Sequence, residues 1–333
     1  MEAAAKVKSI FVYPIKSCRG ISVSQQAPLT PTGFRWDRQW MVINNNGRAY
    51  TQRNEPKLAL VETELPNEAF LEGWEPTGRS FMVIRAPGMQ ALKISLSKPR
   101  DIADGVSVWE WCGSALAEGA EASNWFTNYL GKPSRLVRYN AESETRPVDP
   151  KYAAGEKIMF SDCYPFMLLS QGSLDALNKL LKEPIPINRF RPNILVDGCE
   201  PFSEDLWMGI RINNCTFQGV KLCDRCKVRT VVHSLRDFPS DTSICIHVFN
   251  NTEIVFQVPT INQDTGVAGP EPSETLRQIR SDKVLRPNQK QQGKIYFGQN
   301  LVWKDNLSNG KVLKLGDPVF VMRKVNSAAE AAA

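Results

Sequence analysis

Histidine is almost absent from this chain, and its scarcity removes several kinds of enzyme from consideration. The sequence has only two histidines, His233 and His247, among 333 residues. Ser-His-Asp hydrolases, His-ligated zinc hydrolases and His-based acid–base catalysts all need this residue in their active sites. We therefore expect any chemistry from thiolate, carboxylate, Lys or Arg side chains, or from a bound cofactor.

Long apolar runs and dense charge blocks are also missing. No uninterrupted apolar run reaches about 18 residues, which excludes a membrane-spanning helix on length. The first strand-like pattern, Lys6–Tyr13, begins too early to leave room for a signal or transit peptide, so we expect an intracellular protein, cytoplasmic or mitochondrial. The net charge is +6 and the Lys and Arg residues are dispersed, which argues against nucleic-acid and lipid surfaces and suits a pocket for a small anion.

Glycine-rich phosphate loops of the dinucleotide and P-loop kinds are absent as well. The eight cysteines are mostly isolated in strand-like contexts, which is typical of reduced, buried thiols. Only the pair Cys223 and Cys226 has a spacing that suggests chemistry.

Short strands separated by turn residues dominate the sequence. Alternating apolar patterns predict strands at 6–13, 40–44, 58–64, 81–85, 91–95, 106–111, 135–139, 193–196, 208–212, 215–222, 296–303, 311–314 and 318–322. Helical spacing predicts helices at 114–130 and 173–181, with Ser173 as the N-cap of the second. Many strands and few helices favour an α+β fold, mainly β, built around a barrel. A polar, Pro- and Gly-bearing stretch at 146–157 marks the expected boundary between two domains, 6–140 and 141–325.

The segment 223–226 (CDRC) follows directly on a strand-like run, and three interpretations of it stay open. A structural zinc site needs four ligands, and His233, Cys245 and His247 are the nearby candidates. A thioredoxin-type dithiol needs the pair at the start of a helix, and no helical pattern follows. In the third interpretation, one thiolate ligates a soft, redox-active metal within a cofactor, and Arg225 lowers the thiol pKa and meets a phosphate.

Cationic residues stand beside predicted strands at three other places. Lys16 and Ser17 follow the first strand after a proline turn, Arg38 precedes the next strand, and Arg191 lies in NRFRPN before another. Each alone reads as a solvated surface charge. Together with the CDRC segment they could hold one phosphate-bearing ligand, because Arg forks and Lys ammonium groups are the usual phosphate ligands.

Several blocks, taken in order, resemble one family. They are VYPIKSCRG, DRQW, SDCYPF, NRFRPNI, CDRC, INQDTG with EPSETLR, and FGQN followed by GDPVFV. Over about 6–323 the chain resembles the amidoxime-reducing-component branch of the MOSC proteins, named after the C-terminal domain of molybdenum cofactor sulfurase. The resemblance implies a MOSC-type β-barrel domain over 141–325, preceded by an N-terminal MOSC-associated α/β domain, itself barrel-like, over 6–140. It also implies a molybdenum–molybdopterin cofactor, and the family is described as binding pyridoxal phosphate too.

The resemblance assigns roles to particular residues. Cys226 is the implied molybdenum ligand, and Asp162, beside the metal, is a candidate proton donor. The implied contacts to the pterin and its phosphate are Lys16, Ser17, Arg38, Cys163, Arg191, Asp224, Arg225 and Asn300. Two of these depart from the family pattern, since Cys163 stands where a hydroxyl residue is common and Asp224 where Ser is common. An aspartate near a phosphate is unfavourable unless Arg225 or Lys227 offsets its charge.

About thirty residues, 229–258, interrupt the resemblance, which otherwise continues as if Val228 were joined to Pro259. The segment holds both histidines and Cys245. One interpretation is a lid or an extra metal-binding loop; the other, which we favour, is a translated retained intron or splice form. A long surface loop is tolerated thermodynamically, but a small displacement this close to the metal ligand would lower activity.

The activity that the resemblance implies is reduction of N-hydroxylated compounds: amidoximes and N-hydroxylated bases, with nitrite as a further candidate. It implies electrons from NADH through cytochrome b5 reductase and cytochrome b5, since this chain has no recognisable flavin or haem site. The cofactor would carry the redox chemistry while the protein supplies ligation, orientation and access. The alternatives are a carrier that stores the cofactor without turnover, a form inactivated by the interruption, and a zinc module with ligands from 229–258.

Overall fold

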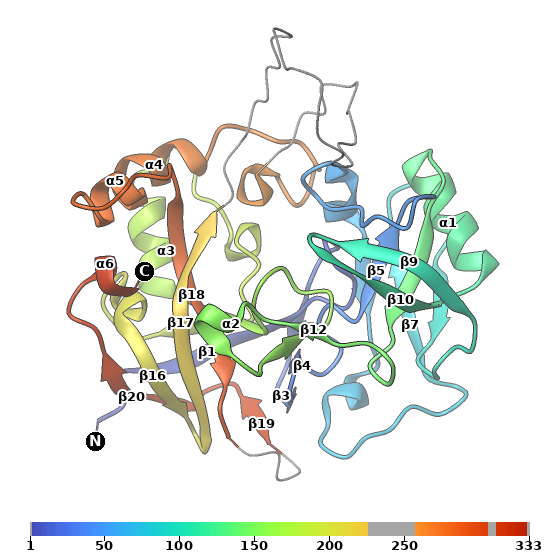
Figure 1. Cartoon of the computed structure of the whole chain (residues 1–333), viewed down its shortest axis with the longest axis horizontal. Helices are drawn as coiled ribbons and strands as arrows, with labels where there is room; N and C mark the ends of the chain where they lie inside the picture. The colour runs from blue at the N-terminus through green and yellow to red at the C-terminus, as the bar shows by residue number, and fades with distance from the viewer. Residues whose placement is uncertain (1, 226–256, 306–310, 332–333) are drawn as a thin grey trace, which may run out of the picture.

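A computed structural model describes residues 2–225, 257–305 and 311–331 of the chain (Figure 1). Two groups of strands lie next to each other. A closed barrel occupies the left of Figure 1, and several smaller sheets, built mostly from the N-terminal third, occupy the right. The prediction of an α+β fold that is mainly β is confirmed.

Seven strands close the barrel. In spatial order they are β15 (Ile194–Asp197), β14 (Phe166–Ser170), β18 (Ile295–Trp303), β17 (Cys215–Arg225), β16 (Trp207–Ile212), β20 (Pro318–Lys324) and β1 (Ala5–Val12). Pairing of β1 with β15 completes the circle, so that these strands leave few exposed edges; β2 (Ile21–Val23) extends the sheet from β1. Neighbours are antiparallel apart from β14 and β15, which are parallel.

Three smaller sheets form the other group. One has the order β5 (Trp40–Ile43), β11 (Arg135–Tyr139), β10 (Trp111–Ala117) and β9 (Ile102–Val108). The others are β6 (Glu62–Glu64), β7 (Phe81–Arg85) and β8 (Leu92–Ser95), and β19 (Val312–Lys314), β3 (Gln26–Thr30) and β4 (Gly33–Phe34). Helix α1 (Ala120–Leu130) packs against β11, and a two-stranded ribbon, β12 (Arg146–Pro147) with β13 (Lys157–Ile158), follows.

The remaining helices are short, and several cover the barrel. They are α2 (Pro150–Ala153), α3 (Gln171–Asn178), α4 (Ser273–Arg280), α5 (Asp282–Leu285), α6 (Ala328–Ala331), and the 3-10 turns η1 (Pro56–Leu60), η2 (Asn67–Phe70), η3 (Ile187–Arg189), η4 (Ser203–Leu206) and η5 (Val258–Thr260). Helix α4 packs against β18, and every residue of that strand is buried. Within the described ranges, no helix has the length and hydropathy to cross a membrane.

Both helix predictions need correction. The helix expected at 114–130 begins only at Ala120, because residues up to Ala117 pair with the neighbouring strands and Gly119 turns the chain with φ 91°. The second helix starts at Gln171, and its N-cap is Ser170 rather than Ser173. Ser170 Oγ accepts the backbone N–H of Ser173, whose own hydroxyl donates to a buried glutamate instead.

The strand predictions mostly hold, with two mixed cases. The segment expected to be one strand over 106–111 contains the end of β9, a two-residue turn and the first residue of β10. The segment expected to be a strand over 58–64 is a 3-10 turn up to Leu60 and a strand only from Glu62. The two predicted domains exchange strands, since β1 completes the barrel and β19 pairs with β3. One apolar core runs through both groups of strands. The limits 6–140 and 141–325 stay a prediction.

Candidate functional site

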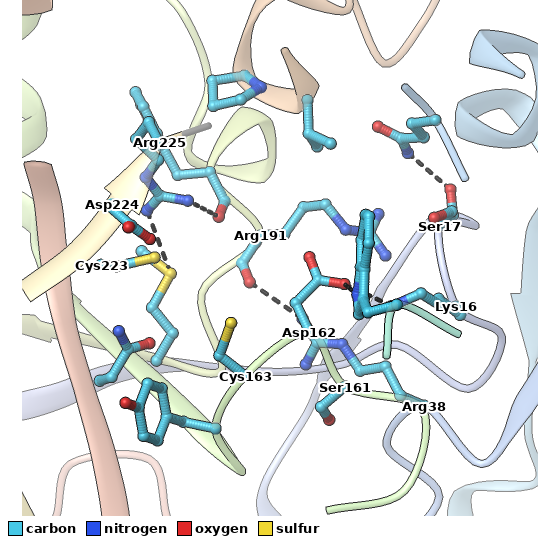
Figure 2. A pocket seen from close by; sticks show the side chains of 18 of the residues that line it. Lys16, Ser17, Arg38, Ser161, Asp162, Cys163, Arg191, Cys223, Asp224 and Arg225 are labelled. Atoms are coloured by element: carbon cyan, nitrogen blue, oxygen red, sulfur yellow. Dashed lines mark hydrogen bonds and ion pairs between the residues drawn. The ribbon is translucent and has the colours of Figure 1, made fainter. Parts of the chain in front are cut away.

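One cavity of about 540 Å³ collects the residues to which the sequence assigned roles. Its walls come from the end of β17, the loop before β14, the loop before β15, the turn after β1 and the β9–β10 hairpin. Nine of the ten predicted site residues line it, namely Lys16, Ser17, Arg38, Asp162, Cys163, Arg191, Asp224, Arg225 and Asn300 (Figure 2). The tenth, Cys226, lies outside the described residues.

The cavity is strongly cationic. Its described lining includes seven basic side chains, Lys16, Arg38, Arg53, Arg191, Lys221, Arg225 and Lys294, and three acidic ones, Glu110, Asp162 and Asp224. A concave site with this excess of positive charge concentrates anions. Its volume also falls within the usual range for small-molecule sites.

The backbone of the cavity wall is strained. Among the described residues, seven non-glycine positions have a left-handed φ, and four of them line the cavity: Ser17 (68°), Arg38 (47°), Trp109 (54°) and Arg191 (56°). Such conformations cost about 1–2 kcal/mol per residue for an L-amino acid. Their concentration around one cavity is typical of a functional site, where side-chain placement outweighs local stability.

Tyr13, at the end of β1, supports two of these arginines. The Arg38 guanidinium carbon lies 4.2 Å from the centroid of the tyrosine ring, and that of Arg191 lies 4.3 Å from it. The phenol donates to the Pro192 carbonyl oxygen at 3.0 Å, and burial raises the pKa of Tyr13 to about 12. Neutral Tyr13 therefore holds two cations that would otherwise repel each other.

Asp37 fixes the direction of Arg38. Its buried carboxylate accepts the Tyr13 backbone N–H at 2.8 Å and the Arg38 Nη1 at 2.6 Å. Burial raises the pKa of Asp37, although the Arg38 charge opposes that rise. Arg38 also donates to Asn193 Oδ1 at 3.0 Å, and Arg191 donates to the Cys18 carbonyl oxygen at 2.6 Å. Both guanidinium groups are thus held at the cavity wall before any ligand binds.

Lys16 and Asp162 form an ion pair at the opposite side of the cavity from β17 (Figure 2). The Lys16 ammonium is buried and also donates to the Phe160 carbonyl oxygen at 2.9 Å. Burial lowers the pKa of Lys16 to about 8, and Asp162 partly opposes this. The Oδ2 atom of Asp162 lies 3.8 Å from the Arg53 guanidinium, and the Trp109 indole N–H donates to the other carboxylate oxygen at 3.3 Å.

The charges around Asp162 do not favour the proton-donor role expected for it. Enclosure by protein raises its pKa, but the Lys16 ammonium and the Arg53 guanidinium lower it further, and the pKa lies well below its usual range. Asp162 is therefore an acceptor toward Lys16 and Trp109, and its expected role as a proton donor stays a prediction. The group in this pair that carries a transferable proton is Lys16.

Arg146 holds the loop that carries Asp162. Its buried guanidinium donates to the backbone carbonyl oxygens of Met159, Ser161 and Asp162, at 2.9 Å for Met159 and 3.1 Å for Asp162. The hydroxyl of Ser161 is buried and has no partner among the described residues. A buried hydroxyl without a partner at a cavity wall is a natural contact for a polar ligand.

The end of β17 forms the other wall. Register shifts between β17 and β18, at Gly219/Lys221 and at Leu222/Asp224, mark irregularities of the kind that re-aim side chains beside sites. Arg225 donates to the carbonyl oxygens of Phe297 and Phe190 and to the Met167 sulfur, so it uses four of its five N–H groups within the protein. It therefore offers a ligand mainly its charge.

Asp224 and Cys163, the two departures from the family pattern, both have identifiable surroundings. The cation closest to Asp224 is Lys294, at 3.9 Å, whereas Arg225 is occupied by backbone carbonyls and Lys227 lies outside the described residues. Burial, followed by the charge of Asp162, raises the pKa of Cys163 to about 12. Cys163 is therefore a neutral thiol at physiological pH.

The described residues give little support to the dithiol and zinc interpretations of the CDRC segment. Cys223 lies in strand β17 rather than at a helix start, unlike the thioredoxin arrangement. No group of three or more His, Cys, Asp or Glu side chains suited to a metal occurs within 2–225, 257–305 and 311–331. His233, Cys245 and His247, the candidate zinc ligands, lie outside these ranges, as does most of the interruption at 229–258.

Comparisons with known proteins agree with the resemblance. Residues 4–133 match the profile described as "MOSC N-terminal beta barrel domain", and residues 155–248 match "MOSC domain". The chain is 30% identical, over 97% of its length and 84% of the relative, to mitochondrial amidoxime reducing component 2 of Bos taurus. Component 1 of Homo sapiens gives the same identity and coverage. The chain belongs to the amidoxime-reducing-component family of MOSC proteins.

The chain is also similar to part of a longer protein. Molybdenum cofactor sulfurase of Oryza sativa subsp. japonica is 28% identical over 94% of this chain, which spans 35% of that protein. The match to the MOSC domain ends at residue 248, inside the interrupted segment of this family member.

Several cavity residues, among them Arg53 and Trp109, were not predicted from the sequence of this MOSC protein. Arg53 lies in a turn after β5, and Trp109 begins the turn between β9 and β10. Neither belongs to a recognisable sequence block, and both are far in sequence from the residues they contact. The one available signal was the pair Trp109 and Trp111 around a single residue, which alternation reads simply as part of a strand.

Proposed function

We propose that this protein binds a molybdenum–molybdopterin cofactor in the cationic cavity and reduces N-hydroxylated compounds such as amidoximes. The observation that carries the proposal is that nine residues, assigned from the family resemblance and scattered along the sequence, line one cavity with seven basic side chains and three acidic ones. Membership of the amidoxime-reducing-component family supports the reaction class.

The described residues fit an anionic, polar cofactor. Arg38 and Arg191 are pre-positioned for a phosphate, with their forks fixed by Tyr13 and Asp37. The buried Ser161 hydroxyl and the Arg53 Nε have no partner among the described residues, which leaves hydrogen-bonding capacity for a bound group. Cys226, one residue beyond β17, would supply the thiolate ligand.

When bound, the cofactor supplies the metal and the electrons for cleavage of the N–O bond. The protein's own contribution is then position and protons. The Lys16 ammonium, with its lowered pKa of about 8, holds a proton at Nζ beside Asp162. Asp162 keeps that ammonium in place as an acceptor. Lys16 is therefore proposed as the proton source on the cavity side.

Turnover tests the proposed activity. Purified protein, supplied with NADH, cytochrome b5 reductase and cytochrome b5, should reduce benzamidoxime to benzamidine and contain molybdenum near one per chain. Molybdenum with no turnover of any N-hydroxylated substrate would instead support a carrier of the cofactor. Zinc near one per chain without molybdenum would support the zinc module and exclude both the reductase and the cofactor carrier.

A deletion tests the interruption. We propose that removing residues 229–258 raises cofactor occupancy, because the segment begins close to Cys226 and the family continues without it. Equal occupancy in both forms would support a functional loop instead. Location in mitochondria or cytoplasm, which the relatives' names suggest only for themselves, is tested by fractionation of cells expressing the full protein.

A further inference from the structure

The backbone conformation at Trp109 is unfavourable for a residue with a large side chain. Trp109 opens the tight turn between β9 and β10 with φ 54°, where glycine or asparagine is the usual choice. Its side chain is 43% exposed, and it lines the cavity. Trp36 also has a positive φ, but it is buried and its indole N–H bonds to a carbonyl oxygen, so packing accounts for it. Packing does not account for Trp109.

The ring of Trp109 is nevertheless fixed in place. Its indole N–H donates to Asp162, the Arg53 guanidinium carbon lies 4.5 Å from the ring centroid, and the Lys16 ammonium lies 5.6 Å from it. Cations at these distances are attracted to an aromatic face and restrict its motion. The indole of Trp109 is therefore a rigid, flat, apolar surface among the charged groups of the cavity.

Arg53 is less committed to the protein than the other arginines of the molecule's interior. Its Nε has no partner among the described residues, and its nearest carboxylate oxygen, on Asp162, lies 3.8 Å away, beyond hydrogen-bond length. Arg138, by contrast, donates to a glutamate and to three carbonyl oxygens. The guanidinium of Arg53 is therefore available to a ligand that fills the cavity.

We propose that Trp109 and Arg53 together form a stacking platform for a flat, conjugated ring whose edge carries a hydrogen-bond acceptor. The inference rests on the proposed function for its two candidate rings, the aromatic group of an N-hydroxylated substrate and the pterin of the cofactor. Either ring would stack on the indole and place its acceptor at the guanidinium. This explains why a strained turn position carries the largest side chain available.

Variants at position 109 test the platform. Trp109→Ala removes the ring, Trp109→Phe restores an aromatic face, and Trp74→Phe is the matched control, because Trp74 also packs against an arginine, Arg35, away from the cavity. The readouts are molybdenum and pterin content, the ratio of kcat/KM for benzamidoxime to that for acetamidoxime, and quenching of tryptophan fluorescence by benzamidine. Far-UV circular dichroism checks folding.

Each possible result supports or overturns the proposal. A substrate platform predicts that Trp109→Ala keeps its cofactor, loses about tenfold in the substrate ratio and loses the quenching, with partial rescue in Trp109→Phe. A cofactor platform predicts lowered pterin content in Trp109→Ala, again rescued by Phe. A Trp109→Ala protein that matches the wild type in all three readouts overturns the proposal. Should the wild type reduce no substrate, the proposed function fails, while pterin content and quenching still test the platform.

Discussion

Two ion pairs in this molecule each join a cation, a carboxylate and a tryptophan indole, yet the protein encloses one of them while the other borders the cavity. In the sheet of β5, β11, β10 and β9, Arg138 pairs with Glu118, and both side chains are nearly inaccessible, at 4% and 5%. The Trp40 indole donates to the same carboxylate at 2.6 Å, and the Arg138 guanidinium lies 4.8 Å from the Trp40 ring. The remaining donors of Arg138 are taken up by backbone carbonyls.

The ion pair of Lys16 with Asp162 at the cavity has the same arrangement, but the protein does not enclose it. The carboxylate again accepts from an indole, that of Trp109, and a cation again lies over the ring. Here, however, the carboxylate is 53% exposed and borders a cavity, and Arg53 beside it keeps an unpartnered Nε. Residue types alone therefore do not distinguish a structural ion pair from a functional one. The distinguishing feature is a hydrogen-bonding group that is left without a partner.

Breaking the closed pair should have the largest effect on stability. Glu118→Ala leaves Arg138 buried without its carboxylate, and arginine cannot escape by losing its proton. We expect the free energy of unfolding to fall by about 3–5 kcal/mol. Urea unfolding measures this, with Glu121→Ala on the exposed face of α1 as the control. A loss no greater than that of the control would show that the pair does not hold the sheet together.

The pH dependence of the open pair comes next in size. The Lys16 pKa is lowered from 10.5 to about 8 in the folded protein, so between these values the unfolded chain binds more protons. Stability should therefore rise with pH across this window, by up to about 3 kcal/mol from Lys16 alone. Below about pH 8 this residue contributes no slope.

The comparison variant is Lys16→Met, which has no titrating group at this position. The wild type minus the variant, measured by urea unfolding from pH 7 to 10.5, should show the rise. A flat difference would mean that Lys16 keeps an ordinary pKa and that the cavity does not desolvate it.

Breaking the open pair should cost least. Asp162→Asn removes the carboxylate, but Lys16 can lose its proton, because its pKa is already lowered to about 8 and falls further without Asp162. We expect a loss of stability of about 1–2 kcal/mol at pH 7. Urea unfolding of Asp162→Asn beside Glu118→Ala measures the contrast directly. If both variants lose the same stability, the distinction between a closed and an open pair is wrong.

Much of the fold followed from the sequence, because strand alternation is a local pattern. β7 and β11 were predicted to the residue, and β5 and β18 to within one. The wrong start of the first predicted helix also came from a local pattern. Residues before Gly119 carry helical spacing by coincidence, and their pairing with distant strands overrides it.

The site was predictable only where recognisable blocks exist. Lys16, Arg38 and Arg191 lie in such blocks, and the structure brings them to one cavity. Trp109 and Arg53 meet across more than fifty residues, and nothing in either segment announces the other. The ionisation of Asp162 could not be read from sequence either, since it depends on which cations surround the carboxylate in space.

We propose that the thiolate of Cys226 holds molybdenum in this cavity. Metal analysis of Cys226→Ala beside Cys223→Ala tests it most directly, since both variants remove one thiol from the same segment. We predict that Cys226→Ala loses nearly all bound molybdenum. Cys223→Ala should retain most of it, because the Cys223 side chain, in β17, packs against the apolar core although it also borders the cavity. Undiminished molybdenum in Cys226→Ala would contradict the account.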